Sequence, residues 1–196
     1  MKNMVNEPAL KYNSVLPDEY LARERAALDK HEYYQGEVFA MSGASLQHNV
    51  IFSNLFTDIG NKLKGKGCRP YGSDLRIHIP KNTLYTYPDI SIICGEPHLT
   101  DNEFDTATNP TVIIELLSKS TRNYDKGEKY TLYRDIDSLN EYILVDTEKI
   151  YAEKHVRNAD GSWQLTDYRS LEQSFTIDSI KLNILLKDIY EGVSFA

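Results

Sequence analysis

The stretch Thr111-Val112-Ile113-Ile114-Glu115-Leu116-Leu117 decides how this chain folds. It is almost wholly apolar and β-branched at its start, which is typical of a strand buried on both faces of a sheet. A helix is expected from about Arg122 to Asp135, and Glu141 to Asp146 forms a second buried strand. A strand, a helix and a strand in this order make the crossover between two parallel neighbours. The stretch therefore predicts an α/β fold.

A long helix is expected before this unit, from Ser45 to Lys64. Its apolar residues recur every four to five positions, as in a helix with one buried face, and glycines end it. These residues are Leu46, Val50, Leu55, Ile59 and Leu63, followed by Gly65 and Gly67. Two strands follow, from Arg69 to Ile79 and from Tyr85 to Cys94, with a turn at Pro80-Lys81-Asn82. Because the chain turns back there, the two strands are expected to be neighbours.

The remaining elements are shorter. They are a helix from Pro17 to Asp29, a hairpin in Tyr34 to Met41, strands at Ile150 to Val156 and Trp163 to Tyr168 around the turn at Asn158 to Gly161, a strand in Phe175 to Ile184, and a helical turn at Leu185 to Tyr190. The C-terminal part is therefore expected to be antiparallel, beyond the parallel crossover.

The composition indicates one globular domain over residues 1–196, with residues 1–15 as a flexible arm. The chain is 41% hydrophobic and 26% charged, which is ordinary for such a domain. Met1 to Tyr20 contains no continuous apolar segment, and the longest apolar stretches fall well short of the roughly 20 residues that a membrane helix needs. We therefore expect neither secretion nor a membrane span.

The cysteine content favours a reducing compartment. Cys68 and Cys94 are the only cysteines, too few for a small disulfide-stabilised scaffold, and they lack metal-ligand spacing. We expect two separate buried thiols and a cytoplasmic location.

The charge balance argues against a general nucleic-acid binder. The chain has 22 basic and 29 acidic residues, a net charge of −7, so its overall field repels phosphate. A local basic cleft remains compatible with this total, and acidic residues that hold cations would contribute to it.

Glu115 is the most informative single residue. An ionised carboxylate within an apolar strand costs several kcal/mol unless a cation or a hydrogen-bond network compensates it. Asp89 opens another apolar strand, so neighbouring strands would bring the two carboxylates to one edge of the sheet. Such a pair can bind Mg²⁺, which prefers oxygen ligands and keeps several waters.

The chain resembles the Uma2 family, which belongs to the PD-(D/E)xK superfamily of restriction-endonuclease-like nucleases. The matching pieces are His31 to Glu37, Met41 to Ser45, His48-Asn49, Tyr87-Pro88-Asp89-Ile90, Asn109-Pro110, Ile114 to Thr121, Asp125, Lys129, Tyr133, Glu141-Tyr142 and Asp188-Ile189-Tyr190. The resemblance implies a three-layer sandwich, in which a central mixed sheet lies between the long helix and the Arg122 to Asp135 helix, with an antiparallel C-terminal hairpin.

The resemblance also implies a catalytic site. In the superfamily an aspartate and a glutamate hold the metal, here Asp89 and Glu115, and a lysine two positions after the glutamate assists the attacking water. This sequence has Leu117 there, and a leucine can neither donate a hydrogen bond nor stabilise charge on a phosphate. In the Uma2-like pattern Lys129 on the following helix takes that part, with Lys126 as its competitor.

The implied function is a Mg²⁺- or Mn²⁺-dependent endonuclease that acts on DNA, with a homodimer as a plausible state for cutting two strands. His48 and Glu37 are possible supporting groups near the metal, and Ser118 could orient Glu115 or cap the following helix. Two other functions stay open. One is a catalytically impaired module with the same fold that binds nucleic acid or a protein, and the other is hydrolysis of a small phosphate ester.

Each assignment also has a structural alternative. Asp89 could be a polar residue at a strand start, and Glu115 could form a salt bridge with Arg76. Lys129 could form an ordinary exposed helix pair with Asp125. His48 is more often a packing or surface histidine, and Glu37 a hairpin residue.

Overall fold

The structure, a computed structural model, describes residues 14–101, 103 and 105–195, so residues 1–13 of the expected arm lie outside the described residues. The helical elements are α1 (Pro17–Glu24), α2 (Leu46–Leu63), α3 (Arg122–Tyr124), η1 (Asp125–Lys129), α4 (Tyr130–Tyr133), η2 (Asp178–Ile180) and α5 (Leu186–Ile189). The strands are β1 (His31–Tyr34), β2 (Glu37–Ala40), β3 (Cys68–Gly72), β4 (Arg76–Ile79), β5 (Leu84–Thr86), β6 (Ile90–Cys94), β7 (Thr106–Ala107), β8 (Val112–Leu117), β9 (Glu141–Asp146), β10 (Ala152–Arg157), β11 (Trp163–Tyr168), β12 (Ser174–Ile177) and β13 (Leu182–Leu185).

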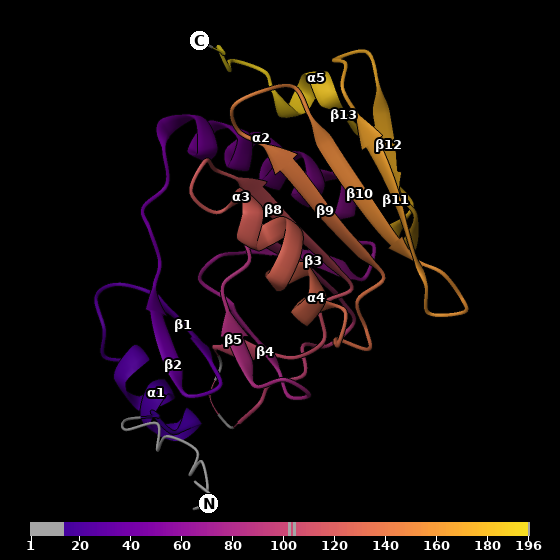
Figure 1. The fold of residues 1–196 in the computed structure, drawn as a ribbon. Helices are drawn as coiled ribbons and strands as arrows, with labels where there is room; N and C mark the ends of the chain where they lie inside the picture. Colours follow the sequence, from indigo (N-terminus) through magenta and orange to yellow (C-terminus); the bar gives the residue numbers. More distant parts are fainter. Residues whose placement is uncertain (1–13, 102, 104, 196) are drawn as a thin grey trace, which may run out of the picture.

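The central sheet has six strands in the order β11-β10-β9-β8-β6-β3 (Figure 1). Strands β8 and β9 pair in parallel, and the other neighbours are antiparallel. The parallel pair is the predicted crossover, because α3, η1 and α4 connect β8 to β9. The sheet is therefore mixed, as the resemblance implies.

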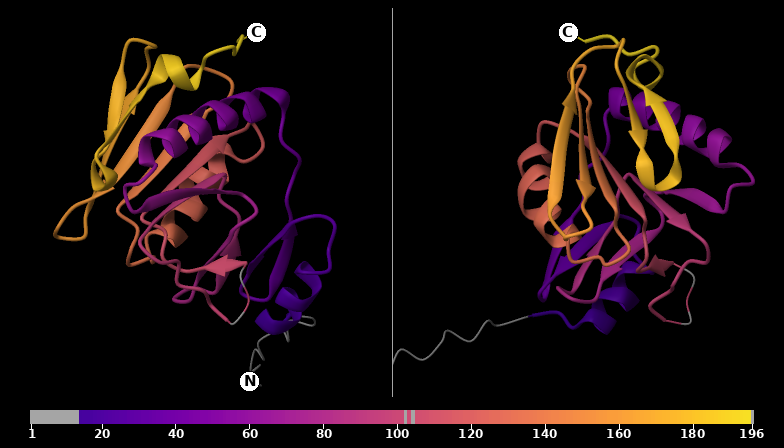
Figure 2. Two further views of the ribbon diagram at one scale, coloured as in Figure 1. Left: turned by 180° about the vertical axis from the view of Figure 1, so that it is seen from behind. Right: turned by 90° about the vertical axis from the view of Figure 1, so that its right-hand side faces the viewer.

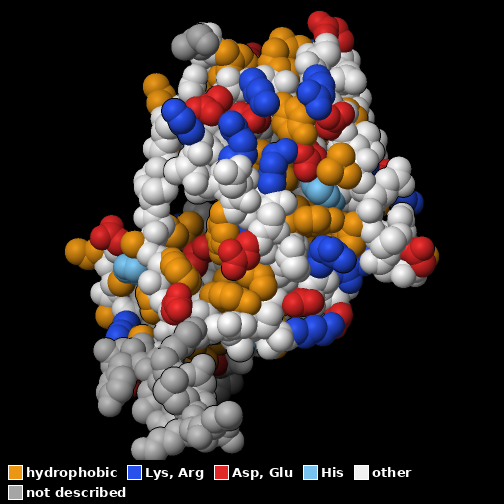
Figure 3. Space-filling model, in the orientation of Figure 1, with side chains coloured by type: hydrophobic (Ala, Val, Ile, Leu, Met, Phe, Trp, Pro, Cys, Tyr) orange, Lys and Arg blue, Asp and Glu red, His pale blue; other side chains and the backbone are white. Residues whose placement is uncertain are grey.

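The two faces of this sheet are covered by different helices (Figure 2). Helix α2 lies on one face and the continuous α3-η1-α4 helix on the other, which confirms the predicted three-layer arrangement. On the α3-η1-α4 face, Ile113 and Leu117 of β8 pack with Leu132 and Tyr133 of the helix. The outer surface on this side carries charged side chains of both signs among apolar ones (Figure 3).

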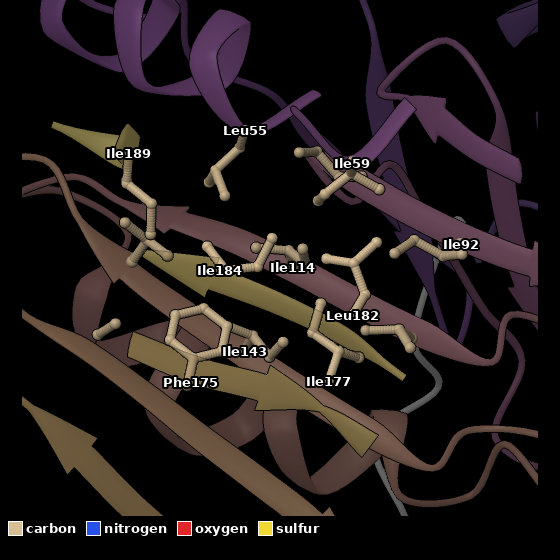
Figure 4. Close-up of a cluster of buried hydrophobic side chains, with 14 of the residues drawn as sticks. Leu55, Ile59, Ile92, Ile114, Ile143, Phe175, Ile177, Leu182, Ile184 and Ile189 are labelled. Atoms are coloured by element: carbon tan, nitrogen blue, oxygen red, sulfur yellow. The ribbon is translucent and has the colours of Figure 1, made fainter. Parts of the chain in front are cut away.

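The α2 face is almost purely apolar. Ile51, Leu55, Ile59 and Leu63 follow one another at every fourth position and are buried against the sheet and the C-terminal hairpin (Figure 4). Each such side chain contributes about 1.5–3 kcal/mol when fully buried. The predicted stripe was correct for its second half, but Leu46 is 80% exposed because the first turn of α2 extends beyond the sheet.

The expected long hairpin is divided between two sheets. Strand β3 pairs with β6 in the central sheet, whereas β4 pairs with β5 in a separate five-stranded sheet of order β2-β1-β5-β4-β7. The breaks fall at residues 73–75 and 87–89, where neither strand continues. The prediction of adjacent strands was correct, but that of two unbroken strands was wrong, since each strand is divided between the two sheets.

The two cysteines form a disulfide bond between Cys68 and Cys94. They are direct cross-strand partners in the register of β3 and β6, which brings their side chains together. The prediction of separate buried thiols was therefore wrong. Among the residues that the structure describes, no helix is long and apolar enough to span a membrane.

Two other local expectations were met with adjusted limits, and a third was wrong. The β1-β2 hairpin turns at Gln35-Gly36, and the predicted Pro17 helix ends at Glu24. The expected strand from Phe175 to Ile184 is a hairpin of β12 and β13, because Lys181 adopts a left-handed conformation with φ of 51° and reverses the chain.

Candidate active site

Asp89 and Glu115 lie side by side at one edge of the central sheet. In the antiparallel register of β6 and β8, Ile90 is opposite Ile114, which places Asp89 beside Glu115. Each carboxylate accepts a backbone hydrogen bond from the neighbouring strand. The Asp89 N–H donates to Glu115 Oε2 at 3.2 Å, and the Leu116 N–H donates to Asp89 Oδ2 at 2.7 Å. The backbone therefore holds each carboxylate in a fixed orientation.

Glu115 points away from α2. Side chains alternate along β8, so Glu115 shares the α3-η1-α4 face with Ile113 and Leu117. It is 4% exposed, and its Oε1 atom accepts a hydrogen bond from the Tyr133 hydroxyl at 2.8 Å. The carboxylate is thus buried between the sheet and the helix that follows β8.

Lys129 meets Glu115 from that helix. Its ammonium Nζ lies 2.9 Å from Glu115 Oε1, 3.1 Å from Glu32 Oε1 and 3.9 Å from Asp125 Oδ1. Lys129 is buried, so the alternative of an exposed pair with Asp125 is wrong. Arg76 contacts Asp105 and Tyr87, so the proposed Arg76–Glu115 salt bridge is wrong as well.

Lys126, the predicted competitor, points elsewhere. Its ammonium pairs with Glu153 on β10 and lies 3.4 Å from the Tyr151 hydroxyl. The helix is π-helical over Asp125–Lys129, and such one-turn widenings are frequent at functional sites. Both lysines of this turn contact a glutamate of the sheet, but only Lys129 among the two contacts Glu115.

Leu117 occupies the position where the superfamily pattern has a lysine. It is fully buried and packs in the apolar cluster with Leu132 and Tyr133. The lysine that reaches Glu115 therefore comes from η1 and not from β8, and residue 117 is part of the core.

The buried carboxylates are short of positive charge. Burial raises the pKa of Glu115, with Asp89 and Asp125 adding to the shift and Lys129 opposing it. Burial raises the pKa of Asp125 in the same way. Burial alone would lower the pKa of Lys129, but the surrounding acids, Glu115 foremost, raise it well above its ordinary value. Lys129 is therefore a permanent cation at neutral pH.

The supporting residues expected from the sequence have different fates. His48, in the first turn of α2, has its Nε2 atom 3.1 Å from Asp89 Oδ1, so it belongs to the cluster. Glu37 begins β2 with an exposed side chain. Ser118 hydrogen-bonds Thr121 at the start of the α3-η1-α4 helix, as a capping residue would.

Sequence reasoning missed Glu32 as a site residue. Glu32 lies on β1 and is 8% exposed, and besides Lys129 it contacts the Thr86 hydroxyl and, at 3.5 Å, the Tyr124 hydroxyl. The available signal was an acid in a strand otherwise rich in tyrosine. Its approach to Lys129 depends on how the two sheets meet, which no local pattern encodes.

The cluster suits a divalent cation by its chemistry. Glu115, Glu32 and Asp125 supply carboxylate oxygens around a single buried lysine, and Asp89 lies beside Glu115. Hard cations such as Mg²⁺ bind oxygen. The described residues contain no group of three or more His, Cys, Asp or Glu placed to hold a metal. Of these four acids, Asp89 and Glu115 are the two joined directly, by the Asp89 N–H to Glu115 Oε2 hydrogen bond.

The mixed sheet between α2 and the α3-η1-α4 helix forms a three-layer α/β sandwich. A solved structure from Anabaena variabilis, titled a "putative nuclease belonging to DUF820", has this fold, with a TM-score of 0.74 and 17% identity over 90% of this chain and 98% of that one. The chain belongs to the Uma2 family, described as "Putative restriction endonuclease", whose profile matches residues 17–186.

Two relatives from Synechocystis sp. (strain ATCC 27184 / PCC 6803 / Kazusa) are similar in sequence. The uncharacterized protein slr1290 is 34% identical over 98% of this chain and all of its own length. The uncharacterized protein sll1609 is 38% identical over 76% of this chain and 84% of its own length.

Proposed function

We propose that this protein is a Mg²⁺-dependent endonuclease that hydrolyses phosphodiester bonds in DNA. The observation that carries the proposal is the grouping of Asp89, Glu115 and Lys129, two carboxylates held side by side and a buried ammonium 2.9 Å from one of them. The family description supports the reaction class, and the donor set supports the cation.

Asp89 and Glu115 would hold the cation. A bound Mg²⁺ or Mn²⁺ would lower the pKa of a water and offset the charge of the scissile phosphate. Lys129 carries a fixed positive charge beside Glu115, so it stabilises negative charge in the transition state and is no proton acceptor. Tyr133 and the Asp89 backbone orient Glu115, and His48 lies against the second oxygen of Asp89.

The test is cleavage of supercoiled plasmid and of single-stranded DNA in Mg²⁺ or Mn²⁺. Asp89→Asn and Glu115→Gln keep the size of each side chain and remove its charge, so both should lose cleavage. Asp137→Asn is the matched control, because Asp137 is 82% exposed and pairs only with Lys81 among its described contacts. Cleavage that persists in both site variants would refute the assignment.

A second candidate function is a module with the same fold that binds without cleaving. Its support is that each oxygen of Glu115 and Asp89 already has a hydrogen-bonding or ionic partner, together with Leu117 at the superfamily lysine position. Absence of cleavage of any substrate, with Mn²⁺ binding unchanged by Asp89→Asn, would favour this module.

The cytoplasmic location and a homodimer that cuts both strands belong to the nuclease proposal, and light scattering in solution tests the dimer.

A further inference from the structure

Three cationic side chains converge on one buried tyrosine. The charged groups of Lys126, Lys149 and Arg169 lie 4.7, 5.2 and 5.2 Å from the centre of the Tyr151 ring. They come from three separate segments, namely η1, the β9-β10 turn and the residue after β11. We call this group the Tyr151 surface. Because all three charged groups lie this close to one ring, their positive charges are concentrated in a small region.

Tyr151 is a rigid support for these cations. Its hydroxyl donates to Glu153 at 2.5 Å, its backbone N–H donates to the Tyr190 hydroxyl at 3.1 Å, and it is only 9% exposed. The ring face attracts cations, so the three side chains are held over it before any ligand arrives. Preorganised groups lose less entropy on binding.

Two of the three cations of the Tyr151 surface, Lys149 and Arg169, are exposed, whereas Lys126 is half-buried. Lys126 is paired with the buried Glu153, whereas the Arg169 side chain is 70% exposed and pairs with Asp167 at the rim. Lys149 is exposed, and among the described residues its ammonium lies over the ring and forms no ion pair. Figure 3 shows Lys and Arg side chains gathered on the upper part of this face, where α3 and the β9-β10 connection lie.

The Tyr151 surface adjoins the candidate active site through η1. Lys126 belongs to the surface and Lys129 to the site, and they are three residues apart on the same helical turn. A ligand that carries one negative charge at each repeat along its length could contact both regions at once. On a chain with a net charge of −7, this group of cations is a local exception to the overall charge.

We propose that the Tyr151 surface binds the phosphodiester backbone of DNA beside the group to be cleaved. The proposal rests on the proposed function for its choice of polyanion. Contacts with phosphate position a nucleic acid without reading its sequence, so this surface sets the register of the strand and not the recognition site.

The test is binding of a fluorescent duplex oligonucleotide, measured by anisotropy in EDTA so that cleavage cannot interfere. The double variant Lys149→Ala/Arg169→Ala should weaken binding about tenfold or more at moderate salt. The slope of log affinity against log salt should also become less steep, by the amount that corresponds to about two phosphate contacts. The matched control, Lys64→Ala/Lys66→Ala, removes two equally exposed lysines at the α2-β3 turn and should change binding far less. Equal losses in the two double variants would overturn the proposal, and so would failure of the wild-type protein to bind DNA.

The same experiment separates this inference from the proposed function. If the wild-type protein binds DNA but does not cleave it, and the Lys149→Ala/Arg169→Ala variant loses binding, DNA binding by the Tyr151 surface is supported and the proposed nuclease activity is refuted. If cleavage requires Asp89 and Glu115 while this variant binds DNA normally, the proposed nuclease activity is supported and DNA binding by the Tyr151 surface is refuted.

Discussion

Glu115 and Glu153 look alike in position but differ in chemistry. Each lies on a strand of the central sheet, faces the α3-η1-α4 helix and pairs with a lysine of η1. Burial opposes ionisation of both. At Glu153, hydrogen bonds from His155, Lys126 and Tyr151 outweigh burial and lower the pKa to about 2.

At Glu115 the balance is reversed. Burial and the neighbouring Asp89 and Asp125 outweigh Lys129, and the pKa is raised. Glu153 is therefore a structural carboxylate whose charge is compensated by its hydrogen-bonding partners, whereas the charge of Glu115 is compensated less fully. The two lysines supply matched variants that separate these roles.

The largest difference is expected in stability. Lys129→Met should lower the free energy of unfolding by about 3–5 kcal/mol, because Glu115 and Glu32 keep their burial and lose their shared cation. Lys126→Met should cost about 1 kcal/mol or less, since the Lys126 side chain is 32% exposed. Urea denaturation followed by circular dichroism measures both, and equal losses would contradict the comparison.

The next effect is on turnover, given the proposed function. Lys129→Met should lower kcat about 10²- to 10³-fold with little change in KM, as expected when transition-state stabilisation is lost. Lys126→Met should raise KM severalfold and change kcat little, because it contacts the DNA only through the Tyr151 surface. Steady-state cleavage of an oligonucleotide measures both constants. A loss of kcat in the Lys126 variant alone would reverse the assignment of the two lysines.

A smaller, pH-dependent effect is expected at Glu153. Its pKa is lower in the folded protein than in the unfolded chain, so its stabilisation is present above about pH 4.5 and is lost as the pH falls towards 2. Glu153→Gln should therefore cost about 1.5–3 kcal/mol at pH 7, and the gap from wild type should narrow below pH 4.5. Denaturation at several pH values tests this, and a gap that stays constant down to pH 3 would contradict it.

The smallest effect is stabilisation by a metal. At a Mn²⁺ concentration ten times Kd, the wild-type protein should gain about 1.4 kcal/mol, seen as a rise of a few degrees in Tm. Glu153→Gln should keep this rise and Asp89→Asn should lose it. An equal rise in Asp89→Asn would place the cation elsewhere.

Local patterns were enough to predict much of the fold. The β-branched start of β8, the four-residue spacing in α2 and the turn at Gln35-Gly36 each act within a few residues, so a single sequence carries them. The placement of Asp89 beside Glu115 also followed, because both residues stand in apolar strands that pair with each other.

The remaining features depend on contacts between distant segments. The divided hairpin arises because β4 and β5 join β1 while β3 and β6 join β8, and residues 69–94 alone cannot express that choice. The Cys68–Cys94 bond needed the register of β3 and β6. Glu32 required the docking of one sheet against the other, and the π-helical turn that separates Lys126 from Lys129 has no sequence signal that we recognise.

Because Lys129 lies on a helix and Leu117 belongs to the core, the candidate site depends on how this helix docks on the sheet. Glu115 and Lys129 are brought together only when one short helical segment docks on the sheet. Local opening of residues 122–133 would separate them while β8 remained paired on both sides. The fraction of molecules in which the site is assembled is therefore set by a single docking equilibrium. Amide hydrogen exchange across that segment would report this equilibrium separately from global unfolding.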